Sequence, residues 1–470
     1  MNTDVVVDLT ALSLQPPLLD VKPPHARRLG TSRAASRWHV SAAGLLVLSL
    51  GTGLGWAGNY SFRNIVDGSN SFVNLYSASI NNAGVVAFYG DSTSGVSGVY
   101  RSDGASTTTI VDTSSGQFAF PVEGCRPTID DDGTVAFFIY HVIGSAQVGS
   151  IRTGTGGATI VIAEASDTGP FYGVYGDPCI RNGMVSFYGM EHGNGDHEGV
   201  FTAPARGGSH STIAQSGGKF WDADVFGATS INAAGQVAYW GVLADASSGI
   251  FVGPNGATTI AQTGSRFSSL GNPKISDSGA VAFYAQLGDG SSGDFVSQGG
   301  TVTQVTVAGG GVVAAEFPSI NAAGTVAGRA FLNNGGWAIV AGPNPVVDKV
   351  IGLGDPLFGS TVAFLMGQPG NNGLNNSGQI VFMYALGNGG SGIALATPVV
   401  SPALRFQALD PTHAQLAWPT NATGFVLESA SSLPASAWHV ITNAPVLNGD
   451  QFATVLKMGS TQQFFRLHRQ

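Results

Sequence analysis

One phrase recurs seven times along this chain, and its recurrence constrains the fold more than any other feature. The phrase has the form Ser/Thr-Ile-Asn/Asp-x-x-Gly-x-Val-Ala-Phe/Tyr, as in SINAAGQVAYW at residues 230–240. The third copy, residues 179–188, is one residue short. Consecutive copies lie 44 to 54 residues apart, a period typical of propellers and solenoids. The central glycines of the copies are Gly84, Gly133, Gly183, Gly235, Gly279, Gly324 and Gly378.

Each repeat contains enough short apolar runs for four strands. After the phrase comes a polar turn, a run such as GIFV at residues 249–252, a Gly/Asn turn, and a run such as TTIA at residues 258–261. Short runs separated by turn residues are typical of antiparallel strands. No extended stretch after residue 57 keeps the 3.6-residue apolar period of a helix. We therefore expect an all-β chain in which each repeat forms one four-stranded blade of a β-propeller.

The two ends of the repeat favour a closed ring over an open β-solenoid. The seventh repeat has its third run at residues 391–394 but reaches Pro398 before a fourth. A run at residues 60–67 precedes the first copy and resembles the fourth-strand run at residues 108–112. Completing the last blade with the first strand removes an exposed sheet edge. We predict a seven-bladed propeller over residues 58–398, with the first strand as the outer strand of blade seven.

The repeated phrase, followed by the GIF and TTIA runs, resembles the tandem-repeat propellers of exported bacterial proteins, a group of largely uncharacterised function. It is more distantly similar to TolB-like propellers, which carry a Ser-Pro-Asp-Gly turn at the same place. The resemblance covers all seven repeats, although Gly328-Arg329 replaces the aromatic pair in the sixth. It implies the fold and export, and it implies no catalytic residues.

The first 57 residues predict an export signal. Four arginines precede an apolar run at residues 40–54, and Gly55-Trp56-Ala57 offers small residues for cleavage after Ala57. The run is too short and glycine-rich for a membrane span. We expect an exported protein at the cell surface, in the periplasm or outside the cell, with no membrane span after cleavage. The arginines are Arg27, Arg28, Arg33 and Arg37.

The charge balance restricts the partners. The chain has a net charge of −9, and only 10% of its residues are charged. Five of the 20 basic and three of the 29 acidic residues precede residue 58, which leaves 15 and 26, a net charge of −11. An acidic surface argues against nucleic acid, because phosphate binding needs a basic face. We expect an extracellular polysaccharide or a surface protein as partner, and a monomer.

Residues 399–470 lack the repeat and follow a boundary at Pro398 and Pro402. They contain short alternating runs, among them LAWP, FVLES and FFRL. Alternation at this spacing predicts a small β-sandwich. The runs resemble a fibronectin type III-like module, and that resemblance implies a spacer or attachment role.

The densest cluster of ionisable residues lies at residues 191–198 and has two interpretations. One is a divalent-metal site, because histidine and carboxylate ligands within one loop can hold such an ion. The other alternative is a solvated hairpin turn, and on that interpretation the protein has no cofactor. The cluster comprises Glu191, His192, Asp196, His197 and Glu198.

The only two cysteines, Cys125 and Cys179, lie near the inner strands of neighbouring repeats. In an oxidising compartment they are candidates for a disulfide between adjacent blades. Their different offsets from the repeated phrase argue against the bond, because misaligned Cβ directions prevent it.

The repeated aromatic positions have an ordinary structural interpretation, burial between blades, because side chains alternate along a strand. We expect the first aromatic residue of each pair to be buried there: Phe88, Phe137, Phe187, Tyr239 and Phe283. We also expect Asn232 to bond the backbone of its turn and Gly235 to adopt a positive φ. Repetition therefore indicates scaffold, and function is to be sought where the copies differ.

Two groups of residues are candidates for ligand binding. Trp221 and Trp240 are aromatic residues suited to carbohydrate or protein binding. The carboxylates that precede inner strands are Asp177, Asp222, Asp224 and Glu316. Our leading hypothesis is an exported, non-enzymatic binding or scaffold protein whose ligand is a glycan or a protein. The alternative is a carbohydrate-active propeller hydrolase or lyase, in which these carboxylates converge at the central channel.

Overall fold

The structure is a computed structural model. It describes residues 7–8, 60–121, 125–192, 197–221, 226–305, 312–333, 335–345, 347–366, 372–399, 402–410, 412–420, 425–432, 437–449, 451–457 and 463–469. The chain divides into two compact units. The repeat unit is Asn59–Pro398, and the C-terminal unit combines Met1–Gly58 with Val399–Gln470.

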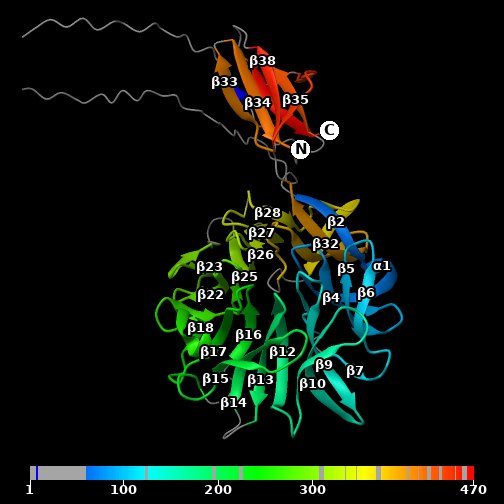
Figure 1. Cartoon of the computed structure of the whole chain (residues 1–470), viewed down its shortest axis with the longest axis vertical. Coiled ribbons are helices and arrows are strands. Elements are labelled where there is room, and N and C mark those ends of the chain that lie inside the picture. The colour runs from blue at the N-terminus through cyan, green and yellow to red at the C-terminus, as the bar shows by residue number, and fades with distance from the viewer. Residues whose placement is uncertain are drawn as a thin grey trace, which may run out of the picture. The chain divides into compact units, whose positions relative to one another are not determined.

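The described residues of the repeat unit form seven antiparallel sheets, numbered 1 to 7 in chain order, which follow one another around the unit from blue to yellow (Figure 1). Sheet 1 consists of β3 (Phe72–Ile80), β4 (Val86–Ser92), β5 (Ser97–Ser102) and β6 (Thr107–Asp112), and sheet 2 consists of β7 (Phe118–Ala119), β8 (Thr128–Ile129), β9 (Val135–Ile143), β10 (Ala146–Gly154) and β11 (Ile160–Glu164). Sheet 3 consists of β12 (Phe171–Arg181), β13 (Met184–Glu191), β14 (His197–Pro204) and β15 (Ser211–Gln215). Sheet 4 consists of β16 (Phe226–Ile231), β17 (Val237–Val242), β18 (Ser248–Val252) and β19 (Thr258–Gln262).

Sheet 5 consists of β20 (Phe267–Leu270), β21 (Lys274–Ile275), β22 (Val281–Leu287), β23 (Ser292–Gln298) and β24 (Thr301–Gln304). Sheet 6 consists of β25 (Val312–Ile320), β26 (Val326–Leu332), β27 (Trp337–Ala341) and β28 (Lys349–Gly352). Sheet 7 consists of β29 (Pro356–Leu357), β30 (Ser360–Met366), β31 (Ile380–Leu386), β32 (Ser391–Pro398) and β2 (Tyr60–Asp67). Helix in the described residues is limited to α1 (Gly68–Ser71) and the 3₁₀ turn η1 (Pro254–Gly256). The prediction of an all-β chain built from four-stranded repeats is confirmed.

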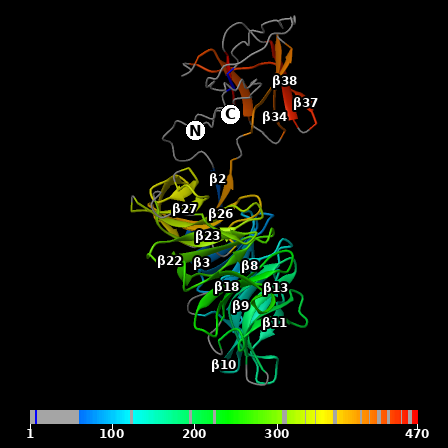
Figure 2. The same cartoon turned by 90° about the vertical axis from the view of Figure 1, so that its left-hand side faces the viewer.

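The first strand of the repeat unit lies in the same sheet as the last. β2 pairs antiparallel with β32, from Tyr60 opposite Pro398 to Asp67 opposite Gly392, and the two strands lie side by side in both views (Figures 1 and 2). Ile65 and Val66 of β2 are buried against strands of sheets 1 and 7. The two ends of the repeat are therefore held together by backbone pairing and by a shared core.

The repeated phrase forms the turn between the first two strands of a sheet. In the fourth copy the Asn232 side chain accepts hydrogen bonds from the backbone N–H of Ala234 (3.1 Å) and Gln236 (2.9 Å), and Gly235 has φ 78°. The Gly235 N–H also bonds the Asn232 carbonyl at 2.9 Å, as in a type I turn followed by a left-handed glycine. The predicted roles of Asn232 and Gly235 are confirmed, and the other six central glycines also have positive φ.

The short third copy connects its first two strands by a different type of turn. Arg181 pairs directly with Met184, so only Asn182 (φ 50°) and Gly183 (φ 73°) form the loop. Asn-Gly with two positive φ angles is the favoured two-residue hairpin turn. The missing residue therefore changes the turn type and places Arg181 where four other copies have asparagine.

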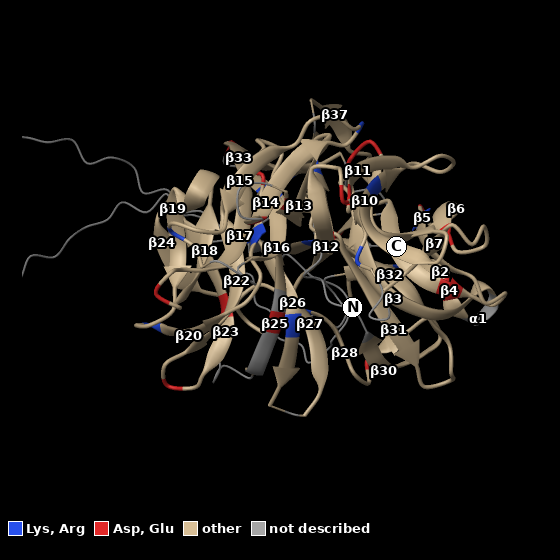
Figure 3. Ribbon diagram, turned by 90° about the horizontal axis from the view of Figure 1, so that it is seen from below, with Lys and Arg blue, Asp and Glu red and all other residues tan. Residues whose placement is uncertain are grey.

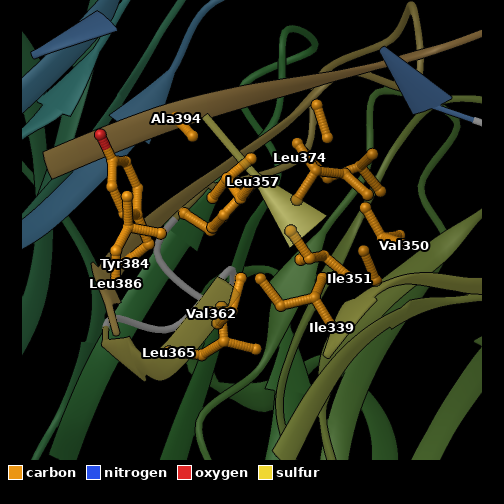
Figure 4. Packing of buried hydrophobic residues seen from close by; sticks show 14 residues of the cluster. Ile339, Val350, Ile351, Leu357, Val362, Leu365, Leu374, Tyr384, Leu386 and Ala394 are labelled. Atoms are coloured by element: carbon orange, nitrogen blue, oxygen red, sulfur yellow. The ribbon is translucent and has the colours of Figure 1, made fainter. Parts of the chain in front are cut away.

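Apolar side chains fill the space between each sheet and the next. Separate buried clusters join sheets 1 and 2, 2 and 3, 3 and 4, 4 and 5, 5 and 6, 6 and 7, and 7 and 1. Figure 4 shows the cluster between sheets 6 and 7, where Ile339 and Ile351 face Leu357 and Leu374. The predicted burial of the repeated aromatic residues is confirmed, because Phe88, Phe137, Phe187, Tyr239 and Phe283 are all fully buried.

The C-terminal unit contains two four-stranded sheets in its described residues. Leu416 and Trp418 of one sheet and Leu427, Phe465 and Leu467 of the other form a common core. Two residues of the predicted leader, Val7 and Asp8, pair with the last strand of this unit; the rest of residues 1–57 lies outside the described residues. The strands are β33 (Arg405–Asp410), β34 (His413–Pro419), β37 (Val446–Asn448) and β38 (Gln451–Lys457), and β1 (Val7–Asp8), β35 (Phe425–Ala430), β36 (His439–Val440) and β39 (Phe464–Arg469).

Candidate functional site

The seven phrase turns lie together at one end of the sheets, which we call the turn face. Where the third residue of a turn is asparagine, its side-chain amide donates to the carbonyl of the third residue in the next turn, as Asn81 does to Asp130 at 2.9 Å and Asn232 does to Ser276 at 3.1 Å. Asn375 of the last turn donates to Asn81 of the first at 3.0 Å. Hydrogen bonds therefore join neighbouring turns from the sixth through the seventh and the first to the fifth, and we call this set of turns the turn ring.

The opposite end of the sheets, which we call the link face, holds the links into the inner strands and the turns between second and third strands. Pro398, the last residue of β32, lies beside Gly378 of the seventh phrase turn, and Tyr60 pairs with Pro398. Both chain connections of the repeat unit therefore leave from the turn face. The link face carries neither of them.

A small polar cavity of about 60 Å³ lies at the centre of the turn ring. All seven sheets contribute to its lining, so it lies on the axis that the sheets share. A cavity of this size holds a few water molecules and is too small for a sugar ring or a peptide. Its polar lining includes Asn82, Arg181, Lys274, Asp277, Asn372 and Asn376.

Arg181 bridges three turns around this cavity. Its guanidinium group contacts Asp131 of sheet 2 at 2.8 Å and Asp277 of sheet 5 at 2.5 Å. Burial by itself would raise the pKa of Asp277, but hydrogen bonds from Arg181, from the Ala233 N–H and from Asn376 lower it below its ordinary value. The pKa of Arg181 is raised: burial opposes its charge, and the two carboxylates outweigh that effect. Arg181 is thus a charged brace across the channel.

A second group of charges lies around Asp177. Its carboxylate accepts a hydrogen bond from the Arg126 N–H at 2.9 Å and lies 3.5 Å from the Arg126 guanidinium. Burial raises the pKa of Asp177 even though Arg126 and Lys274 lower it. Lys274 is itself buried, and burial lowers its pKa. Asp177 is therefore a partly buried carboxylate, paired with Arg126, whose pKa lies above its ordinary value.

Exposed aromatic side chains occur on inner strands and on the links that lead into them. The strands or links that lead into four phrase copies expose Tyr76 (47%), Tyr175 (44%), Trp221 (46%) and Phe364 (50%). β-Bulges interrupt the pairing near Tyr76, Tyr175 and Phe364. A bulge bends a strand and re-aims its side chains, which explains how residues of inner strands reach the surface.

The predicted binding residues that the structure describes have different surroundings. Trp221 is exposed, whereas Trp240 is half-buried in the core between sheets 4 and 5, with its indole N–H buried and unpaired within the described residues. Glu316 pairs with Arg329 at 2.7 Å, whereas Asp177 pairs with Arg126 at 3.5 Å. Asp222 and Asp224 lie outside the described residues.

The predicted metal ligands have other partners. Glu191 contacts His210 at 2.7 Å, and His192 lies 2.9 Å from the Ser166 carbonyl oxygen. His197 is opposite Glu191 in the strand register, and Glu198 is buried. No group of three His, Cys, Asp or Glu side chains suited to a metal ion occurs in the part of the chain that the structure describes, which leaves out Asp196.

The predicted disulfide is not formed. Cys125 and Cys179 are both buried free thiols. Cys125 packs in the core between sheets 1 and 2, and Cys179 packs in the core between sheets 3 and 4. Two whole sheet layers therefore separate their environments, which the different offsets in the sequence already indicated.

The comparison with family models places the chain. Residues 31–267 match the model described as "Family of unknown function (DUF7453)". The chain belongs to the DUF7453 family. The match spans half of the chain and covers its first four copies of the repeated phrase. A search of curated proteins found no match.

Solved structures with a similar arrangement are propeller-containing proteins of low sequence identity. An S511A mutant of puromycin hydrolase is 12% identical with a TM-score of 0.43, and the match covers 73% of this chain and 58% of that one. The β-propeller domain of the trilobed protease from Pyrococcus furiosus is 12% identical, with a TM-score of 0.39 and coverage of 57% and 81%. The lectin from Aleuria aurantia is 11% identical, with a TM-score of 0.33 and coverage of 58% and 93%.

This chain spans less than two thirds of the puromycin hydrolase chain. These neighbours include hydrolytic enzymes and a lectin, so they favour neither catalysis nor binding here. Within the described residues, no helix combines the length and apolar character needed to cross a membrane. Charged residues are sparse along the ribbon (Figure 3).

Proposed function

We propose that the repeat unit is a closed seven-bladed β-propeller and that the C-terminal unit is a fibronectin type III-like sandwich. Three observations support closure: the pairing of β2 with β32, the apolar cluster between sheets 7 and 1, and the hydrogen bond from Asn375 to Asn81. The common core of the two C-terminal sheets supports a sandwich.

We further propose that the protein is exported and acts by binding a glycan or a protein, without catalysing a reaction. The observation that carries this proposal is the exposure of aromatic side chains on the inner strands and on a link that leads into one of them. Large exposed aromatic groups are typical of recognition surfaces, because they combine an apolar face with a rigid shape. The axial cavity is too small to be the ligand site.

The carboxylates also favour binding over hydrolysis. A glycosidase needs two carboxyl groups facing one cleft. In the described residues, Asp177 is engaged by Arg126 and Glu316 by Arg329. The raised pKa of Asp177 is the one observation that favours the alternative, a carbohydrate-active enzyme with Asp177 as its acid.

Three measurements test the proposal. The full chain is applied to a glycan array and to immobilised cell-surface proteins, and product release from the same glycans is measured in parallel. We expect saturable binding without turnover. Robust turnover that is lost in Asp177→Asn would establish the enzyme instead. Cell fractionation tests export, and retention of the protein in the cytoplasm would contradict it.

A further inference from the structure

We propose that Asn74, Tyr76, Asp91 and Ser97 of sheet 1 form a carbohydrate subsite on the link face. Its ligand is a neutral pyranose with two adjacent hydroxyl groups. The inference rests on the proposed binding function and narrows the ligand from glycan or protein to a neutral glycan.

Tyr76 provides a stacking surface. Its ring lies against Tyr89, with centroids 5.1 Å apart and an angle of 25° between the planes. Tyr89 is buried, so it supports one face of the Tyr76 ring while the side chain of Tyr76 remains half-exposed. A rigid aromatic face open to solvent suits the apolar C–H face of a sugar ring.

Asp91 provides fixed acceptors beside that surface. Its carboxylate accepts hydrogen bonds from the Tyr76 hydroxyl (2.6 Å), the Ser97 hydroxyl (2.7 Å) and the Asn74 amide (3.1 Å). Burial alone would raise the pKa of Asp91, but these three bonds lower it, so the group is ionised at neutral pH. Three neutral donors hold the carboxylate in place and occupy three of its roughly four lone-pair sites, which leaves one on Oδ1 to accept a hydrogen bond from a ligand hydroxyl.

The subsite occurs where the repeat departs from its pattern. The residue two places after the second aromatic position is Asp91 in sheet 1, but Tyr140, Met190, Val242 and Gln286 in sheets 2 to 5, and Phe331 and Ala385 in sheets 6 and 7. Sheet 3 has the matching tyrosine pair, Tyr175 and Tyr188, with ring centroids 6.4 Å apart. At these repeat positions of the described residues, the aromatic pair occurs together with a carboxylate in sheet 1 alone, and scaffold geometry does not require that combination.

The backbone aims these side chains outward. β3 has one bulge between Phe72 and Asn74 and a second between Leu75 and Ser77. Gly90 allows β4 to approach this segment, because a Cβ there would lie 2.8 Å from the Asn74 carbonyl oxygen. Two bulges within six residues turn Asn74 and Tyr76 to the same side as Asp91, which their hydrogen bonds confirm.

The chemistry selects a neutral sugar. One hydroxyl group of the ligand donates to Asp91 Oδ1, and the second amide hydrogen of Asn74 is available to donate to the adjacent ring hydroxyl. A sugar acid is repelled by the ionised Asp91. A cationic ligand is the competing class, because cations also favour an aromatic face beside a carboxylate.

Affinity electrophoresis of the full chain tests the subsite. Native gels contain one soluble polymer each: a galactan, a glucan, a mannan, a xylan, polygalacturonate or polylysine. We expect at least one neutral polysaccharide to retard the protein. Loss of a stacking face or of a charged acceptor typically weakens binding by about tenfold or more, so Tyr76→Ala and Asp91→Asn are expected to shift the retardation constant by that factor.

Tyr175→Ala is the matched control, because it removes an equally exposed tyrosine from the pair in sheet 3 that lacks a carboxylate. Tyr76→Phe keeps the stacking face and loses one hydrogen bond, so its retardation should lie between those of the wild type and Tyr76→Ala. Unchanged thermal unfolding of these variants shows that the fold is retained.

Each outcome decides between the two proposals. Retardation that depends on Tyr76 and Asp91 but not on Tyr175 supports the subsite. Retardation by a neutral polysaccharide that is unchanged in Tyr76→Ala and Asp91→Asn overturns the subsite and leaves the binding function standing. Retardation by polylysine alone, lost in Asp91→Asn, replaces the carbohydrate with a cationic ligand. No retardation by any polymer overturns the subsite, and the binding function then depends on the array and protein-binding assays alone.

Discussion

Replacement of Arg181 by methionine tests whether the charged brace holds the turn ring together. The variant keeps most of the side-chain length but removes the contacts to Asp131 and Asp277. A hydrogen bond to a charged group contributes about 1.5–3 kcal/mol, and loss of one partner of a buried pair costs about 3–5 kcal/mol. Asp131 is exposed, and Asp277 keeps its bonds from Ala233 and Asn376. We therefore expect the free energy of unfolding to fall by about 2 kcal/mol.

Urea denaturation of the full chain, followed by intrinsic fluorescence, measures this loss. The matched control is Arg126→Met, whose arginine is 57% exposed and lies 3.5 Å from Asp177. An exposed pair of this kind contributes less than about 1 kcal/mol. If Arg181→Met loses no more stability than Arg126→Met, the brace has no energetic role and the reasoning is refuted.

The same brace makes a prediction about acid. The pKa of Asp277 is lower in the folded protein than its ordinary value of 3.8. The stabilisation that ionised Asp277 gives to the folded state is therefore complete above pH 3.8 and is lost as the pH falls through the lower pKa of the folded protein. The stability difference between wild type and Arg181→Met should shrink as the pH falls below about 4. A difference that stays constant down to about pH 2.5 would contradict the linkage.

Three further predictions concern the scaffold. A chain that begins at residue 68 lacks β2 and the buried Ile65 and Val66, so its free energy of unfolding should fall by about 4 kcal/mol or more and the chain should aggregate. A chain that begins at residue 59 should match the full chain. Urea denaturation and light scattering measure both. Gly235→Ala should cost about 1 kcal/mol in the same denaturation assay, from backbone strain alone, because φ is 78° and no atom lies within 4 Å of the new Cβ. Alkylation followed by mass analysis should label no cysteine in the folded protein and two in urea, since both thiols are free and buried.

The parts of the fold that repeat were predictable from the sequence. Asn232 and Gly235 recur because one turn geometry recurs, and a glycine with positive φ leaves the same mark in each copy. The burial of Phe88 and its equivalents follows from alternation along a strand between two neighbours. Periodicity reports local geometry, and local geometry is what these positions share.

The candidate site was less predictable, because it depends on contacts between distant segments. Arg181 and Asp277 are 96 residues apart, and no spacing rule pairs them. Trp240 is of a residue type suited to ligand binding, but it lies partly in an inter-sheet core, because its position in the repeat decides its orientation. The one sequence signal that pointed to Arg181 was the missing residue in the third copy, which alters the turn and puts a long charged side chain in an asparagine position.

Departures from the repeat therefore differ in meaning, and their surroundings distinguish them. Arg181 departs from the pattern and finds two carboxylates on the turn face, so it strengthens the ring. Asp91 also departs from the pattern, but its partners are neutral, and the tyrosine it holds is half-exposed on the face that carries no chain connection. A scaffold gains little from fixing an exposed ring beside an ionised carboxylate, because the surface contacts that result stabilise weakly. That imbalance is the physical reason to look for the ligand at sheet 1.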